Sequence, residues 1–167
     1  FTLRVRRFHP ANACYSTEWI GTAAVALSGQ TITANFAGAT GASVVALAVK
    51  GTFNPSLPFY DADATLPVTT DPTDTTGCHI LITTTNPNDL IFYTCGIKGP
   101  LASVQTPLGW DLVANTNHGA SLLMVAQRRV GAAQTNLDVN PTLADDHGNG
   151  SIGDAVNGLS AGGLIPR

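Results

Sequence analysis

Charged residues are scarce in this chain. Only 11% of its 167 residues are Asp, Glu, Lys or Arg, whereas roughly 25% is typical of soluble domains. Disordered chains combine low hydrophobicity with high net charge, and this chain has 44% hydrophobic residues and a net charge of −3. We therefore expect one folded domain, and we interpret the low charge as a sign that neighbouring subunits cover part of its surface.

Long apolar runs and strong basic character are also absent. No run reaches the ~18 residues that span a bilayer, so a membrane partner is not expected. The pI near 5.7 argues against a general nucleic-acid binder. The chain begins at Phe1 without a signal peptide, since Arg4, Arg6 and Arg7 interrupt any apolar segment there, and we expect a processed or trimmed product.

The sequence lacks the motifs of common catalytic and metal sites. It contains no HExxH, no Gly-x-Ser-x-Gly elbow, no CxxC pair and no phosphate-binding or dinucleotide-binding glycine pattern. The oxygen-rich segment 145–150 resembles a calcium loop, but His147 stands at its third position and Val156 replaces the final glutamate. We expect no enzyme, no cofactor and no metal.

Three cysteines are present, which leaves at least one outside any intrachain pair. If residues 86–89 form a hairpin turn, Cys78 and Cys95 lie near each other on adjacent strands. Whether they face each other or sit diagonally depends on a register that the sequence leaves open. The interpretation favoured here is that the cysteines are buried and reduced.

Short Ala/Val/Leu/Ile runs separated by Gly, Asn, Thr, Pro and Asp are the main positive feature. The clearest are Thr22–Leu27, Ser43–Val49, His79–Thr84, Leu90–Ile97 and Ser121–Ala126. Their length and boundary residues are typical of β-strands, and most are apolar on both faces. The pattern predicts an all-β, antiparallel β-sandwich, immunoglobulin-like or jelly-roll-like, with an extended N-terminal arm and an irregular C-terminal tail.

The chain divides into three parts by this pattern: an N-terminal strand or arm with its loop over 1–16, the sandwich over 17–130, and a Gly/Asn/Asp-rich extension over 131–167. In the extension we predict a short strand at Asn136–Val139, and from residue 144 onward a tail that is disordered or ordered by a partner.

Local pairings follow from the turn residues. Thr17–Leu27 and Thr31–Phe36 predict one hairpin, with Ile32, Ala34 and Phe36 pointing inward. Cys78–Thr85 and Asp89–Ile97 predict a second hairpin. The proline-rich segment Gly51–Gly77 between them predicts an ordered loop across the end of the sandwich. Further predictions are a loop at His9–Ser16, a short strand at Trp110–Ala114 and a turn at Asn115–Gly119.

A family resemblance covers roughly Thr17–Val130. It rests on the segments Glu18-Trp-Ile-Gly-Thr-Ala, Gln30-Thr-Ile-Thr-Ala-Asn-Phe-Ala-Gly, Val44-Val-Ala-Leu-Ala-Val-Lys-Gly and Phe59-Tyr-Asp, with Gly109-Trp110 further on. In this order they resemble small immunoglobulin-like β-sandwich proteins of tailed phages and prophages. The resemblance implies a virion surface component, and it marks no catalytic residue.

Two groups of residues are candidates for contacts. Arg4, Arg6, Arg7 and Phe8 are candidate assembly contacts, because an arm-like strand can add to the open edge of a neighbour. Asp61, Asp63 and Trp110 are candidate ligand-loop residues for a glycan. The plainer interpretation is that the aspartates cap turns and that Trp19 and Trp110 lie in the core.

The function expected from these observations is that of a non-enzymatic structural protein on the capsid or tail surface of a tailed phage. Its partners would be other virion proteins and copies of itself. Two alternatives remain: a carbohydrate- or receptor-binding module of a tail tip, with a host-surface glycan as partner, and a repeating subunit of an extracellular filament. A small hydrolase built on Asp61 and Asp63 rests on composition alone.

Overall fold

A computed structural model describes residues 1–9, 14–21, 28–38, 42–49, 59–70, 78–98, 104–118, 121–143 and 149–157. Its elements in chain order are β1 (Thr2–His9), β2 (Cys14–Ile20), β3 (Val68–Thr69), β4 (Ile80–Ile82), β5 (Leu90–Lys98), β6 (Val104–Gln105), β7 (Asp111–His118), β8 (Ser121–Arg129), β9 (Leu137–Val139), β10 (Thr142–Leu143) and β11 (Asn149–Val156). Every described strand pairing is antiparallel. The all-β, antiparallel prediction is confirmed. Among these residues, no helix could cross a membrane.

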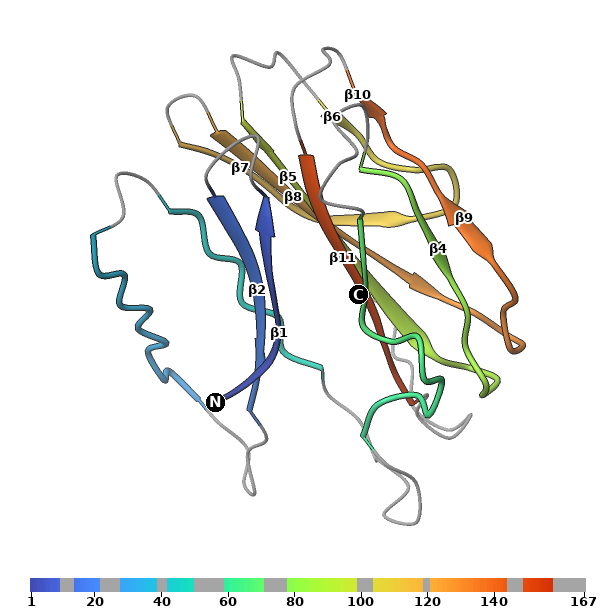
Figure 1. Ribbon diagram of the computed structural model, residues 1–167. Helices are drawn as coiled ribbons and strands as arrows, with labels where there is room; N and C mark the ends of the chain where they lie inside the picture. The colour runs from blue at the N-terminus through green and yellow to red at the C-terminus, as the bar shows by residue number, and fades with distance from the viewer. Residues whose placement is uncertain are drawn as a thin grey trace.

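A five-stranded sheet in the order β3-β11-β5-β8-β7 forms the centre of the molecule (Figure 1). β5 pairs along its whole length with β8 on one side and over eight residues with β11 on the other. Its side chains alternate between fully buried and half-buried, and Ile91, Tyr93 and Cys95 are inaccessible to solvent. This alternation places one face of the sheet in the hydrophobic core.

The core lies between this sheet and a second layer that includes the β4-β9 pair. Ile80 and Ile82 of β4 and Val139 of β9 are buried against it. Their closest approach is at Gly153 of β11, where an added Cβ would lie 2.5 Å from the Ile80 Cδ1 and 2.7 Å from the Ile82 Cδ1. Glycine at this position therefore lets the second layer pack directly on the sheet backbone.

The β1-β2 pair, here called the N-terminal ribbon, covers the opposite face of the same sheet. A Cβ added to Gly96 of β5 would lie 3.6 Å from the Ser16 Oγ of β2, and Arg4 of β1 reaches Asp154 of β11. Gly153 and Asp154 are adjacent in β11, so their side chains point to opposite faces. Figure 1 shows β11 between the ribbon on one side and β4 with β9 on the other. The fold has three layers.

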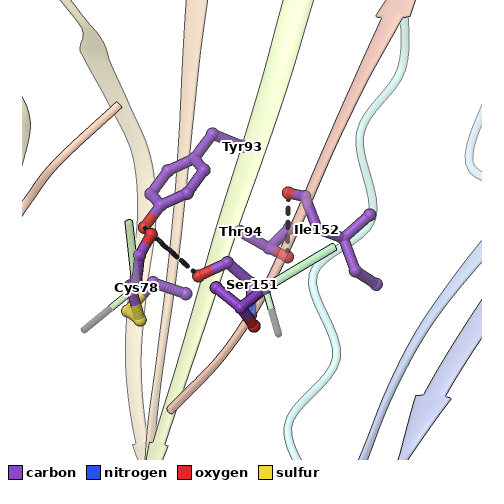
Figure 2. Close-up of a disulfide and its surroundings, with 7 residues drawn as sticks. Cys78, Tyr93, Thr94, Ser151 and Ile152 are labelled. Carbon is purple, nitrogen blue, oxygen red and sulfur yellow. Dashed lines mark hydrogen bonds between the residues drawn. A yellow bond between two sulfur atoms is a disulfide. The ribbon is translucent and has the colours of Figure 1, made fainter. Parts of the chain in front are cut away.

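A disulfide joins Cys78, just before β4, to Cys95 of β5, with the Cα atoms 5.6 Å apart. The prediction of reduced cysteines is wrong for this pair, although the prediction that they are buried and close is right. Figure 2 shows the surroundings of the disulfide: the Tyr93 hydroxyl and the Ser151 Oγ both donate to the Cys78 carbonyl, the latter at 3.1 Å. The bond fastens β4 to the central sheet.

The predicted hairpin of Cys78–Thr85 with Asp89–Ile97 is not formed. β4 pairs with β9, while β5 pairs with β8 and β11 in the other layer. The turn between β4 and β5 therefore crosses from one layer to the next instead of reversing within a sheet. The Asp61 carboxylate accepts hydrogen bonds from the backbone of this turn, at Thr85 and Asn86. The sequence around the turn gives no sign of this distant contact.

The predicted irregular tail is wrong for residues 149–156, because they form β11 in the interior of the sheet. Ser151, Ile152, Asp154 and Ala155 are all at most 3% exposed. Small residues such as these lack the bulk by which a core strand is usually recognised. Here that small size suits a strand packed on both faces. Residues 158–167 lie outside the described part of the chain.

Two other predicted strands do not form. Residues 31–36 and 43–49 have no ladder partner among the described residues, and Ile32 and Phe36, expected to point inward, are each 54% exposed. Thr22–Leu27 lies outside the described residues. The loop predicted at His9–Ser16 ends early, because β2 begins at Cys14, and the turn predicted at Asn115–Gly119 is the second half of β7.

The remaining strand predictions are confirmed. Leu90–Ile97 corresponds to β5, Ser121–Ala126 to β8 and Asn136–Val139 to β9, while His79–Thr84 contains the shorter β4. Within the predicted loop, the described part, 59–70, packs on the sandwich through Leu66 and adds β3 to the sheet edge. The choice between an immunoglobulin-like and a jelly-roll-like order stays a prediction.

Candidate functional site

The N-terminal ribbon has two different faces, fixed by its register. Residues opposite each other in an antiparallel pair point to the same side, and sides alternate along β2, while in β1 a bulge between Leu3 and Val5 shifts the alternation by one residue. The opposed pairs Leu3/Trp19, Arg6/Thr17 and Phe8/Tyr15 therefore share one face. All six residues are exposed, whereas the intervening residues are half-buried. The exposed set is called the ribbon face: Leu3, Arg6, Phe8, Tyr15, Thr17 and Trp19.

The ribbon face is rich in aromatic side chains that solvent reaches freely. Tyr15 is 55% and Trp19 56% exposed. The Phe8 and Tyr15 rings lie 4.8 Å apart in a tilted arrangement, and the Arg6 guanidinium sits 3.9 Å from the centroid of the Tyr15 ring. Aromatic residues and arginine are the types enriched at the energetic centres of protein interfaces. The ribbon face thus has the composition of a contact surface.

The opposite face of the ribbon is anchored to the sandwich by a cluster of polar side chains. The Arg4 Nε donates to the Asp154 Oδ2 at 2.9 Å, and the Arg4 guanidinium lies 3.8 Å from the centroid of the Tyr60 ring. Glu18, also on this inner side, hydrogen-bonds the Asp154 carboxyl group. Asp154 is 1% exposed, so the cluster joins β1, β2 and β11 within the protein.

Burial dominates the electrostatics of this cluster. It raises the pKa of Glu18 to about 8, with the negative charge of neighbouring Asp154 acting in the same direction. Burial likewise raises the pKa of Tyr60 to about 12. Glu18 is therefore protonated at neutral pH and can donate a hydrogen bond to the Asp154 carboxyl group, which also accepts from Arg4.

The four predicted assembly contacts are divided between the two faces. Arg6 and Phe8 belong to the ribbon face, whereas Arg4 and the half-buried Arg7 are on the inner side. Phe1–Phe8 is not a free arm, because β1 pairs with β2 of the same chain. Trp19, predicted to lie in the core, is instead a major exposed residue of the ribbon face. The alternation of β2 around it was the signal that could have shown this.

Asp61, one of the predicted ligand-loop residues, is buried and saturated with hydrogen bonds. Its carboxylate accepts from the backbone N–H groups of Asp63, Thr85 and Asn86 at 2.8 to 3.0 Å, and from the Thr85 hydroxyl. These bonds outweigh burial, which acts in the opposite direction, and lower the pKa of Asp61 to about 2. Asp61 fastens the turn between β4 and β5, as the turn-capping interpretation expected.

The other two ligand-loop candidates do not form a site with Asp61. Asp63 accepts from the backbone N–H of Thr65 at 2.9 Å, which is a local turn contact. Trp110 is 7% exposed and packs edge-on against Tyr93, with the ring centroids 6.0 Å apart. The prediction that Trp110 lies in the core is confirmed. Trp110 is therefore not an exposed platform for a sugar, whereas Phe8, Tyr15 and Trp19 of the ribbon face are exposed aromatic residues.

Among the described residues, no group of three or more His, Cys, Asp or Glu side chains is arranged to hold a metal ion. The calcium-like segment falls largely on 144–148, outside those residues. No family model, curated protein or solved structure matches the chain. The geometry of the ribbon face therefore carries the functional argument.

Proposed function

We propose that this chain is a non-enzymatic structural subunit of a virion, displayed on the capsid or tail surface, whose ribbon face contacts neighbouring subunits. One observation carries the assembly part of the proposal. Nine of the twelve large hydrophobic residues exposed in the described structure lie within residues 1–49, and the other three are Leu81, Leu108 and Leu112. Four of the nine, Leu3, Phe8, Tyr15 and Trp19, gather on the ribbon face, and monomeric proteins rarely expose large contiguous apolar patches.

Two further features support the proposal. The low charge leaves few of the solvated side chains that keep a free monomer soluble. The Cys78–Cys95 disulfide fits a protein that works in an oxidising environment outside the cytosol, such as a particle surface. The assignment to a virion in particular rests on the resemblance to tailed-phage sandwich proteins described above.

The association state of the purified chain tests the proposal. Sedimentation of the wild-type chain over a wide concentration range should reveal oligomers, and a Tyr15→Ser/Trp19→Ser variant should shift the dissociation constant upward by about a hundredfold, since each truncated aromatic is worth about 1–2 kcal/mol. Leu108→Ser, at a side chain 99% exposed outside the ribbon, is the matched control. A wild-type chain that stays monomeric and soluble at all concentrations would refute the proposal.

A second candidate function, glycan or receptor binding, is favoured by the exposure of Tyr15 and Trp19. Aromatic faces open to solvent can stack on sugar rings, and these two residues replace the buried Trp110 as the candidate platform. A glycan array that gives a signal with the wild-type chain and none with Trp19→Ala supports this candidate. An array without signal leaves assembly as the better proposal.

A further inference from the structure

The segment 31–36 has the sequence of a strand but no strand partner. Thr31, Ile32, Thr33, Ala34, Asn35 and Phe36 alternate polar and apolar residues, which is typical of a strand with one buried face. In the structure all six residues are exposed. Among the described residues, no backbone–backbone hydrogen bond joins them to another segment. The trace of 28–38 runs at the left of Figure 1 without forming a strand.

The central sheet has one long open edge that such a segment could fill. Among the described residues β7 pairs only with β8, so its other side has no described partner over Asp111–His118. The opposite edge, β3, has two residues and is too short to receive a strand. A bulge between Leu112 and Ala114 leaves five regular residues, Ala114–His118, one fewer than the segment 31–36 contains.

Charge distinguishes this edge from the others. Proteins protect exposed edges with charged residues, proline or short strands. β1 and β2 carry Arg4, Arg6, Arg7 and Glu18, and β9 is three residues long with Asp138 in the middle. β7 has no charged residue or proline after Asp111, and Leu112 at this edge is 53% exposed. It is the unprotected long edge among the described strands.

We propose that residues 31–36 of one copy of this chain add as a strand to the β7 edge of a second copy. Neither 31–36 nor the stretch of β7 after Asp111 carries an Asp, Glu, Lys or Arg side chain, so no such charge repels the pairing, and main-chain hydrogen bonds would satisfy the donors and acceptors that each leaves open. The segment would lie beside Ala114–His118 and extend the sheet. This inference rests on the proposed assembly function and names the partner and the contact that build it.

Hydrogen exchange on the full-length chain tests the proposal at both surfaces. Comparing a dilute with a concentrated sample, we expect amides of 31–36 and of 114–118 to gain protection together as concentration rises, while β5 and β8 stay unchanged. Protection of 31–36 that is independent of concentration would instead mean pairing within one chain, for instance with the strand predicted at Thr22–Leu27, and would overturn the proposal.

Proline and lysine substitutions test the two partners separately. Thr33→Pro removes a backbone donor inside the segment, and Asn117→Lys places a charge on the receiving edge; each should raise the dissociation constant of the assembly about tenfold or more. Ser28→Pro and Leu108→Lys are the matched controls and should assemble like the wild type.

The outcomes separate this inference from the proposed function. If Thr33→Pro and Asn117→Lys assemble as tightly as the wild type while the Tyr15/Trp19 variant does not, strand addition is wrong and assembly through the ribbon face stands. If the wild-type chain forms no oligomer, both fail. Retained protection of β5 and β8 in every variant shows that a loss of assembly does not come from unfolding.

Discussion

Arg4 and Asp154 are 150 positions apart in the chain, yet the Arg4 Nε lies 2.9 Å from the Asp154 Oδ2. The contact joins the first strand to the last one and passes from one layer of the fold to the next. Asp154 is 1% exposed, so its carboxyl group is shielded from water. It accepts hydrogen bonds from Arg4 and from the backbone N–H of Ala155 instead. The position of the ribbon face depends on this contact.

Arg4→Ala should therefore release the ribbon from the sheet. Removing one partner of a buried ion pair leaves the other charge uncompensated, which typically costs about 3–5 kcal/mol of stability. We expect ribbon docking to weaken by about 3 kcal/mol, the lower end of that range, because the Arg4 side chain is 24% exposed. Loss of hydrogen-exchange protection in β1 and β2 would measure it. Arg6→Ala, on the exposed ribbon face, is the control and should change ribbon protection by less than about 1 kcal/mol.

The elevated pKa of Glu18 predicts that ribbon docking weakens as pH rises. The folded pKa of about 8 lies above the ordinary value of 4.5, so protonation stabilises the docked ribbon fully below about pH 4.5, and this contribution is lost as pH rises toward and through 8. The free energy of ribbon docking should fall by about 1 kcal/mol per pH unit between pH 5 and 8. The groups that face Glu18 are Asp154, Arg4 and Tyr60.

Proteolysis or exchange of the ribbon as a function of pH checks this dependence. Glu18→Gln keeps a donor toward Asp154 but cannot ionise, so its ribbon should stay docked equally well from pH 5 to 8. An equally steep pH dependence in Glu18→Gln would show that another group is responsible.

Asp61 should matter for stability, with an acid-dependent signature. Its folded pKa of about 2 lies below the ordinary 3.8, so its contribution of about 2 kcal/mol is present above pH 4 and is lost as pH falls toward 2. Asp61→Asn removes an oxygen that accepts several donors, and chemical denaturation near pH 7 should show a loss of about 3 kcal/mol. Asp111→Asn, at an exposed residue, should change little; an equal loss there would contradict the capping role.

Gly153 should tolerate no side chain. In Gly153→Ala the new methyl group meets the buried ends of Ile80 and Ile82, and repacking should cost about 2 kcal/mol in the free energy of unfolding. Gly131→Ala is the matched control, because nothing lies within 4 Å of the added Cβ. A neutral Gly153→Ala would mean that β4 can move away from the sheet at little cost.

Sequence reasoning worked where a strand is built from bulky apolar residues. β5 and β8 pair with each other and form the centre of the core, and their Val, Ile, Leu and Phe residues marked them clearly. It failed for β11, whose Gly150-Ser-Ile-Gly-Asp-Ala-Val156 segment resembles a loop. There the small side chains are a consequence of packing on both faces, which no local pattern records.

The candidate site was predictable only in part. The N-terminal strand followed from local alternation, and Arg6 and Phe8 were predicted as contacts of that strand together with Arg4 and Arg7. The inner position of Arg4 depends on Asp154, far along the chain. Similarly, the alternation of 31–36 predicted a strand that does not form in the structure, because whether a partner exists is a property of the surroundings. Asp61 looked like a ligand because its saturation by Thr85 and Asn86 arises from the fold.

The position of β11 has a consequence for how the molecule is made. Because this late segment fills the place between β3 and β5, a chain still emerging from the ribosome carries β5 with one edge unpaired and with its core partners incomplete. The ribbon cannot dock either, since Asp154 belongs to the same late strand. Closure of the sheet and docking of the ribbon therefore both require residues 149–156 to have been synthesised. Incomplete chains would not yet present an assembled ribbon face to complete chains.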